Sequence, residues 1–221
     1  MRHLISRADF EKLSGAIVAG VVGVDLGTSA VVKSMAFVVN MWAKANRTTY
    51  TTRATKHADM NPLDAGDELW RIAGMFPKLR SVRVDEGGLG KGYADMWRKR
   101  ASAEWDREQR RFPGILAAEK RDKMTFVEFM NAELDRNRLL IVDGPETRPL
   151  VEEIELLQWN EERDDFDPRF EDHAADGWLY GWRDCHAWNE KLPPPEPDAE
   201  QKIVKAAERA WKKRQAPWYA R

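Results

Sequence analysis

AIVAGVVGV, residues 16–24, runs directly into DLGTS, residues 25–29. An uninterrupted run of apolar residues and glycines, rich in β-branched valine and isoleucine, predicts a strand that is buried on both faces of a sheet. The Asp, Gly, Thr and Ser that follow are typical of a turn. The sequence therefore predicts a central core strand that ends at a carboxylate, Asp25.

The rest of the chain alternates between strand-like and helix-like patterns. We expect further strands at residues 31–42, 47–57, 80–84 and 138–142, and helices at residues 62–76, 93–103, 122–136, 149–157 and 173–188, with an irregular segment at residues 104–114. The first three strands lie close together in sequence and predict an antiparallel meander, whereas the helix before residues 80–84 predicts a parallel return. The fold class is therefore α/β, a mixed sheet with a three-stranded antiparallel meander plus parallel strands, flanked by helices.

Composition limits the class of protein. The 221 residues are 43% hydrophobic, which is enough for one domain with a sizeable core, and the net charge is −1. Any binding to nucleic acid must then come from local basic patches. No apolar run approaches the roughly 18 residues that a membrane span needs, and the single cysteine, Cys185, excludes an internal disulfide. We expect a cytoplasmic protein, in the host cytoplasm if the chain is viral, with no membrane partner.

Three carboxylates are placed at the ends of expected strands or on the last expected helix. Asp25 ends the central strand, Asp85 ends the strand expected to lie parallel beside it, and Asp176 lies on the last helix. Open α/β sheets hold their sites at the carboxyl ends of such strands. Gathered carboxylates repel one another unless a hard cation neutralises them, and Mg²⁺ and Mn²⁺ prefer oxygen ligands. The sequence predicts a Mg²⁺ or Mn²⁺ site, with two ions as the expected number, suited to displacement at a phosphodiester.

Alternatives to these acids remain open at the same places. An aspartate after a strand is more often a turn former or a helix cap when it is considered alone. Glu86 adjoins Asp85 and competes for its role, and Asp172 lies one helical turn before Asp176 and offers a further metal-ligating carboxylate.

The order of three segments resembles the ribonuclease H-like nuclease domain of tailed-phage terminase large subunits. These segments are VVGVDLGTSA (residues 21–30), SVRVDEGGLGKGYADMWRKR (residues 81–100) and EDHAADGWLYGWR (residues 171–183), and the resemblance covers roughly residues 18–190. It implies a metal-dependent endonuclease that cleaves double-stranded DNA during phage genome packaging, with Asp25, Asp85 and Asp176 as metal ligands. His173 also matches the H-x-x-D pattern of related junction-resolvase-like nucleases, which implies that it binds metal or assists a water.

The sequence departs from that family in one large respect. A terminase large subunit carries an ATPase domain before the nuclease, but no G-x-x-x-x-G-K-[ST] motif occurs here. The glycine-rich residues 87–92 lack the first glycine of that motif, and Lys91 is followed by glycine. We interpret this segment as a turn close to a metal or phosphate. The chain is expected to be a nuclease half, excised or encoded by a split gene.

Two other functions are considered. The residues VGVDLGTSA also resemble the first phosphate loop of actin-like and chaperone-like ATPases, which duplicate this fold around a nucleotide and are much longer chains. A degenerate, catalytically inactive domain that only binds DNA or a portal is the other alternative. The intact acids argue against inactivity.

Basic residues and the C-terminal tail suggest partners. The candidates for contacts with DNA phosphates are Lys91, Arg98, Arg100, Lys120 and Lys123, although a solvated helix face is the alternative interpretation. We expect a nuclease domain at residues 1–190, a Pro-rich linker at 191–198 and a basic tail helix at 199–221. The family resemblance implies that this tail docks on the portal or procapsid through Trp211, and that the ATPase motor and the small terminase subunit are further partners.

Overall fold

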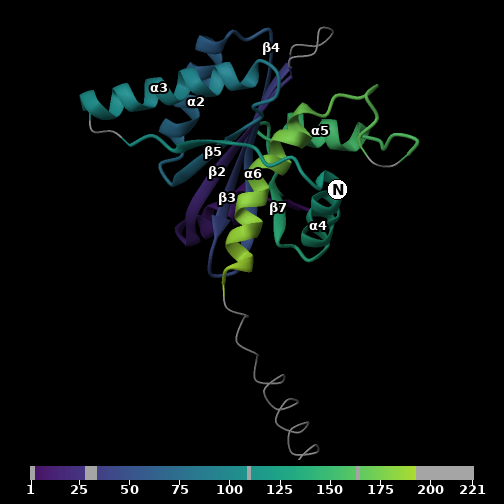
Figure 1. Cartoon of the computed structure of the whole chain (residues 1–221). Coiled ribbons are helices and arrows are strands. Elements are labelled where there is room, and N and C mark those ends of the chain that lie inside the picture. The colour runs from purple at the N-terminus through teal and green to yellow at the C-terminus, as the bar shows by residue number, and fades with distance from the viewer. Residues whose placement is uncertain (1–2, 28–33, 109–110, 163–164, 193–221) are drawn as a thin grey trace, which may run out of the picture. The chain divides into compact units, whose positions relative to one another are not determined.

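A mixed sheet of seven strands forms the centre of the part of the chain that the structure describes (Figure 1). The structure is a computed structural model, and it describes residues 3–27, 34–108, 111–162 and 165–192. Residues Met1–Asn189 form one compact unit. Of the expected linker and tail helix, only Lys191 and Leu192 fall within the described residues.

The order of the strands across the sheet is β1-β7-β4-β3-β2-β5-β6. The strands are β1 (Leu4–Ile5), β2 (Ile17–Leu26), β3 (Ser34–Ala43), β4 (Thr48–Ala58), β5 (Leu79–Val84), β6 (Gly114–Ala117) and β7 (Leu139–Val142). Antiparallel pairing joins β2 to β3 and β3 to β4, whereas β5 pairs with β2 and β7 pairs with β4 in parallel. The expected meander with added parallel strands is therefore confirmed.

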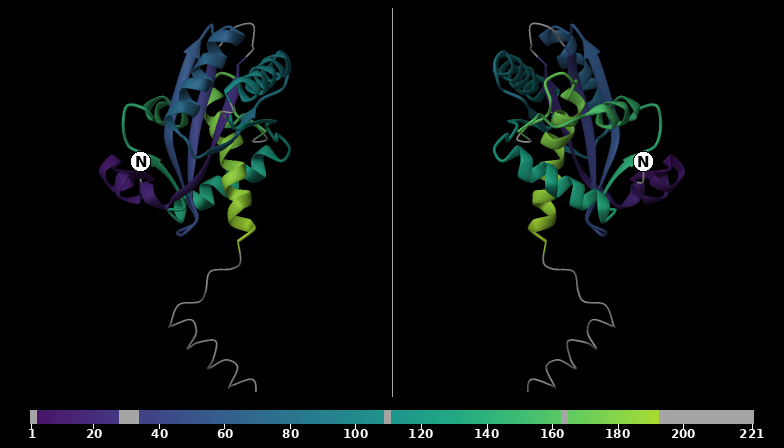
Figure 2. Two further views of the ribbon diagram at one scale, coloured as in Figure 1. Left: turned by 90° about the vertical axis from the view of Figure 1, so that its left-hand side faces the viewer. Right: turned by 90° about the vertical axis from the view of Figure 1, so that its right-hand side faces the viewer.

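Helices cover both faces of this sheet (Figure 2). They are α1 (Arg7–Leu13), α2 (Pro62–Met75), α3 (Gly90–Glu108), α4 (Lys123–Asp135), α5 (Arg148–Leu156) and α6 (His173–Glu190), with a short 3₁₀ turn at Ser14–Ala16. The start of α2 follows from its sequence, because the Asn61 side chain accepts hydrogen bonds from the backbone N–H groups of Leu63 and Asp64, and Pro62 occupies the first turn.

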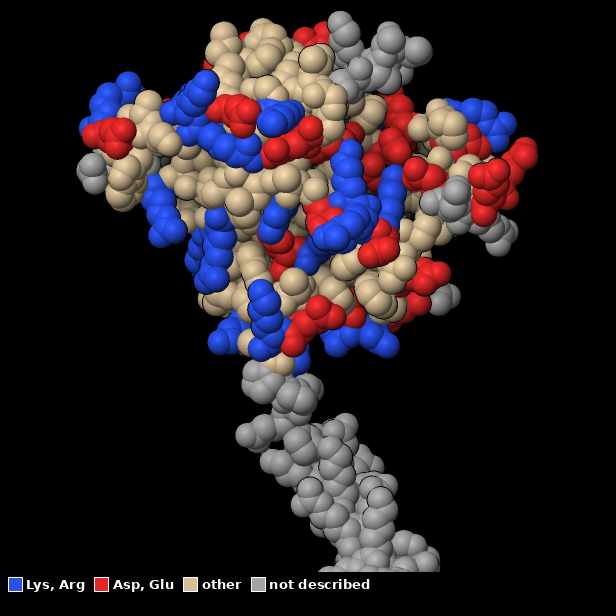
Figure 3. All heavy atoms as spheres, viewed as in Figure 1, with Lys and Arg blue, Asp and Glu red and all other residues tan. Residues whose placement is uncertain are grey.

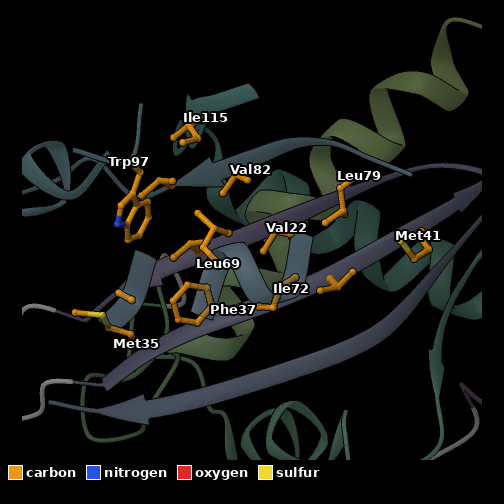
Figure 4. Packing of buried hydrophobic residues seen from close by; sticks show 14 of the residues in the cluster. Val22, Met35, Phe37, Met41, Leu69, Ile72, Leu79, Val82, Trp97 and Ile115 are labelled. Carbon is orange, nitrogen blue, oxygen red and sulfur yellow. The ribbon is translucent and has the colours of Figure 1, made fainter. Parts of the chain in front are cut away.

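The buried apolar residues form two clusters, one on each face of the sheet. Charged side chains of both signs are spread among other residues on the surface that Figure 3 shows, whereas the residues of the two clusters are buried. On one face, Leu69 of α2 and Trp97 of α3 pack against strand residues such as Val22 and Phe37 (Figure 4). On the other face α4, α5 and α6 contribute the cluster that contains Trp178. Burial of these side chains is the main force that holds the layers together.

Three expectations about elements are wrong. The edge strands β1 and β6 are absent from the sequence prediction, because β1 has only two residues and β6 buries a single side chain, so neither shows a strand pattern. α3 begins at Gly90, inside the expected glycine turn, and continues to Glu108 where irregular structure was expected. It is tied to α2, since Trp70 of α2 donates a hydrogen bond to Glu104 and Arg100 pairs with Asp67 of α2.

No helix within the described residues has both the length and the apolar character that a membrane crossing requires.

The contact between β2 and α6 is made by glycines. A Cβ atom on Gly23 of β2 would lie 1.8 Å from the carbonyl oxygen of Gly177, and one on Gly181 would lie 3.0 Å from the Gly23 nitrogen. The backbones of the helix and the strand therefore touch directly. The buried Asn40 side chain supports this approach by donating to the Trp178 carbonyl at 3.3 Å and accepting from the Thr51 hydroxyl at 2.8 Å.

Substitution of Gly23 by Ala should lower the free energy of unfolding by about 1–3 kcal/mol, because the methyl group forces α6 away from β2. Gly92→Ala in α3 is the control, since a Cβ there meets nothing within 4 Å. That change should stabilise the protein by up to about 1 kcal/mol, because alanine is the better helix former. Urea unfolding of both variants measures the difference, and equal stability of the two would contradict the contact.

Candidate active site

The structure brings the three predicted acids to one edge of the sheet. Val24 of β2 is aligned with Val84 of β5, and the Asp85 N–H donates to the Val24 carbonyl at 3.0 Å. Asp25 and Asp85 are the next residues after this aligned pair, so they lie side by side at the ends of the parallel strands β2 and β5. Asp176 lies in the first turn of α6, which the glycine contact places against β2.

The electrostatics of the acids show the same convergence. Burial raises the pKa of Asp25, the hydrogen bond and charge of His173 oppose this rise, and the charges of Asp85 and Asp172 add to it. Burial also raises the pKa of Asp176, to about 7, with Lys123 opposing and Asp172 and Asp25 adding to the rise. Asp25 therefore lies within the field of Asp85 and Asp172, and Asp176 lies within the field of Asp25 and Asp172.

Each of the three acids has a basic partner. Asp25 Oδ2 lies 2.7 Å from His173 Nδ1. Asp85 Oδ2 accepts a hydrogen bond from Lys120 Nζ at 2.5 Å. Asp176 Oδ1 lies 3.0 Å from Lys123 Nζ. The hydrogen bond to Asp25 raises the pKa of His173, whereas burial alone would lower it. The overall rise favours the imidazolium form.

Asp176 is held from two sides. Burial alone would lower the pKa of Lys123, but Asp176 and Asp165, the latter 2.8 Å away, raise it overall. The Tyr180 hydroxyl donates to Asp176 Oδ2 at 3.3 Å. Burial raises the pKa of Tyr180, and the negative charges of Asp176, Asp25 and Asp85 raise it further.

The competing carboxylates are placed differently from Asp85 and Asp176. Glu86 forms an ion pair with Arg98, which neutralises it. The Asp172 side chain is one-third exposed and lies 3.9 Å from Lys123 and 4.0 Å from His173. Its carbonyl accepts the Asp176 N–H at 2.7 Å. Asp172 thus stays near the site as a fourth carboxylate, whereas Glu86 is engaged elsewhere.

The predicted DNA contacts fall into two groups. Lys120 and Lys123 reach the acids, as partners of Asp85 and Asp176. Lys91 is exposed in the first turn of α3. Arg98 bonds to Glu86 and Asp95, and it donates to the Ile115 carbonyl at 3.0 Å.

Arg100 is not brought to the acids by the structure. Its guanidinium lies 4.3 Å above the Trp70 ring, and it pairs with Asp67 and Glu104. These contacts tie α3 to α2. Cys185 is buried, and burial raises the pKa of its thiol, so it is inert packing.

Sequence reasoning missed two residues of this site. Tyr180 lies one turn after Asp176 on α6, so the spacing alone was a usable signal. Asp165 reaches Lys123 from the acidic loop before α6, and no local pattern marks it.

The donor atoms of the acids at this site suit a hard cation, but their spacing in this structure does not yet form a closed site. Asp25, Asp85, Asp172 and Asp176 offer only oxygen, which Mg²⁺ and Mn²⁺ prefer. Asp176 Oδ1 is buried, and within the described part of the chain it has the Lys123 ammonium 3.0 Å away but no hydrogen bond of good geometry. Also among the described residues, no group of three or more His, Cys, Asp or Glu side chains stands close enough to hold an ion. The lysines neutralise the acids in this arrangement.

Replacement of Asp176 by Asn should raise the melting temperature more at pH 8 than at pH 5 in metal-free buffer. The pKa of Asp176 is higher in the folded than in the unfolded chain, so stability is lost as the pH rises through the folded value of about 7. At pH 8 the wild-type carboxylate is buried and ionised, whereas asparagine carries no charge. Melting curves at both pH values test this, and an equal gain at both would contradict the raised pKa.

Comparison with known proteins identifies the fold. No protein-family model matches the sequence, and the curated proteins contain no match. A large terminase from a thermophilic bacteriophage has a similar structure, with a TM-score of 0.61 and 14% identity over 81% of this chain and 41% of that chain. This chain therefore spans about two fifths of that terminase.

Isolated nuclease domains match over more of their length. The nuclease domain of the large terminase from bacteriophage SPP1, solved with bound Mn, has a TM-score of 0.52 and 16% identity over 82% of this chain and 96% of that chain. The human cytomegalovirus terminase nuclease domain has a TM-score of 0.51 and 12% identity over 78% and 86%. The structural neighbours of this chain are terminase nuclease domains, and the chain has their ribonuclease H-like fold.

Proposed function

We propose that this chain is a divalent-metal-dependent endonuclease that cleaves double-stranded DNA, as the nuclease part of a phage genome-packaging terminase. The observation that carries the proposal is the convergence of Asp25, Asp85 and Asp176 at one edge of the sheet. The fold supports it, because a nuclease domain of the same fold was solved with bound Mn.

The residues that would hold Mg²⁺ or Mn²⁺ are Asp25, Asp85 and Asp176, with Asp172 as a further carboxylate. Two such ions would supply an activated water and neutralise charge on the phosphodiester. His173 orients Asp25 through Nδ1 and, as an imidazolium, can provide a proton at the site.

Lys120 and Lys123 have a second role in this proposal. In the structure they neutralise Asp85 and Asp176. A cation bound by these acids would take over that neutralisation and free both ammonium groups to contact DNA phosphates. Lys91, exposed on α3, is a third phosphate contact. Figure 3 shows Lys and Arg side chains on the face that α6 crosses, interspersed with Asp and Glu side chains. The proposed contacts with phosphates therefore rest on individual lysines rather than on a uniformly basic surface.

The proposed organisation follows the sequence interpretation. Residues 1–190 are the nuclease domain, 191–198 the linker and 199–221 the basic tail. In a packaging terminase the domain would work in the host cytoplasm with an ATPase motor, a small terminase subunit and the portal or procapsid. The tail and its Trp211 are the proposed contact with the portal or procapsid.

Purified protein should nick or linearise plasmid DNA in Mn²⁺ or Mg²⁺ without sequence preference. Asp25→Asn and Asp85→Asn should each lower the rate by about 100-fold or more, because each removes a carboxylate from the proposed metal site. Gel electrophoresis of the plasmid measures cleavage. Asp135→Asn, at the exposed end of α4, is the matched control and should cut like the wild type. Undiminished cutting by Asp25→Asn would refute the assignment.

A non-catalytic DNA-binding module is the second candidate. It is favoured by one observation, namely that a histidine or lysine partner already engages each acid within the described residues. The same plasmid experiment separates the two functions. Binding of DNA without cleavage in either metal would support the module.

Neither ATP nor ADP, each with Mg²⁺, should raise the melting temperature of the protein. The sequence has no Walker loop, and 221 residues hold a single copy of the fold rather than the two copies of an actin-like ATPase. A thermal-shift assay measures this, because a ligand that binds only the folded state raises its stability. A rise of several degrees would favour the actin-like function instead.

A further inference from the structure

One row of residues runs across three neighbouring strands beside the proposed metal site. Asp25 of β2 is paired with Ala36 of β3, and Ala36 is paired with Lys56 of β4. Residues that are directly opposite in antiparallel strands point to the same face of the sheet. Ala36 is fully buried in the cluster under α6, so the row lies beneath that helix. Its two ends are charged and its middle is a small side chain.

The chain segment that carries the third acid is fastened to both ends of this row. At one end, His173 Nδ1 lies 2.7 Å from Asp25 Oδ2. At the other end, Lys56 Nζ donates to Glu171 Oε2 at 2.6 Å and also to Glu153 of α5.

Glu153 provides a second attachment for the same segment. Its side chain is only 3% exposed. Its Oε1 accepts the backbone N–H of Ala175, in the first turn of α6, at 2.8 Å. A buried carboxylate needs a compensating charge, and Lys56 supplies it while holding Glu171 as well. Asp172 and Asp176 therefore lie on a short segment whose position depends on Lys56, Glu153 and Asp25 together.

We infer that Lys56 and Glu153 are positioning residues for the metal site. They hold the segment at residues 171–176 so that Asp176 stands beside Asp25, although neither residue belongs to the ligand set. The inference rests on the proposed function. Lys56 bonds to Glu171 and Glu153 to the Ala175 N–H, and Glu171 and Ala175 are the chain neighbours of Asp172 and Asp176. Direct hydrogen-bond partners of metal ligands change metal affinity by about 10- to 100-fold, and we expect these more distant attachments to act at the lower end of that range.

The test is a Mn²⁺ titration of the full chain by calorimetry, at a temperature where each variant is folded by circular dichroism. Lys56→Met should weaken Mn²⁺ binding by about 10-fold or more. Lys56→Arg should restore most of the affinity, since arginine can also bond two carboxylates. Glu152→Gln is the matched control, because Glu152 adjoins Glu153 on α5 but is exposed and pairs with Arg148. It should bind Mn²⁺ like the wild type.

A second variant keeps the inference testable if Lys56→Met does not fold. Glu171 is half exposed, so Glu171→Gln removes one arm of the attachment with little risk to the core, and it should also weaken Mn²⁺ binding. Unchanged affinity in folded Lys56→Met, or in Glu171→Gln where the former is unfolded, would overturn the inference. If the wild type binds Mn²⁺ and Asp25→Asn binds it equally well, the proposed metal site is refuted, and the positioning role with it.

Discussion

The direct backbone contact between β2 and α6 is the constraint on which the rest of this structure depends. Gly23 leaves no room for a side chain beneath Gly177, so the helix lies against the strand. Asp25 is two residues beyond Gly23, and Asp176 directly precedes Gly177. The packing of these glycines therefore decides how near the two carboxylates come. Larger residues at the contact would force α6 away from β2 and so separate the two acids.

Close placement of carboxylates creates an electrostatic problem that the chain solves with its own cations. Lys120 pairs with Asp85, Lys123 with Asp176, and the His173 imidazole with Asp25. Without such partners, mutual repulsion and burial would favour protonation of the acids. In the proposed function a divalent cation would have to displace Lys120 and Lys123 from Asp85 and Asp176 before it could bind these carboxylates.

Much of the fold was predictable from local patterns. The apolar run of β2, the meander after it and the positions of α2, α4, α5 and α6 follow from periodicity and caps, and the structure confirms the mixed sheet. The choice of Asp25, Asp85 and Asp176 as neighbours also followed from topology, because parallel strands end at the same edge. Short edge strands and the length of α3 were missed, since tertiary contacts rather than local propensity stabilise them.

The sequence by itself determined the fold class and the residue types available for chemistry, because hydrophobic periodicity and strand endings are local properties. Tertiary structure decided which charges meet. Lys123, a predicted DNA contact, pairs with Asp176 in the structure. Arg100, also predicted to contact DNA, packs on Trp70, and Lys56 carried no signal in the sequence. These outcomes depend on strand register and helix packing, which join residues about 20 to 120 positions apart. The sequence around a charged residue does not reveal which distant residue it will pair with, so the ion pairs are determined only by the folded structure.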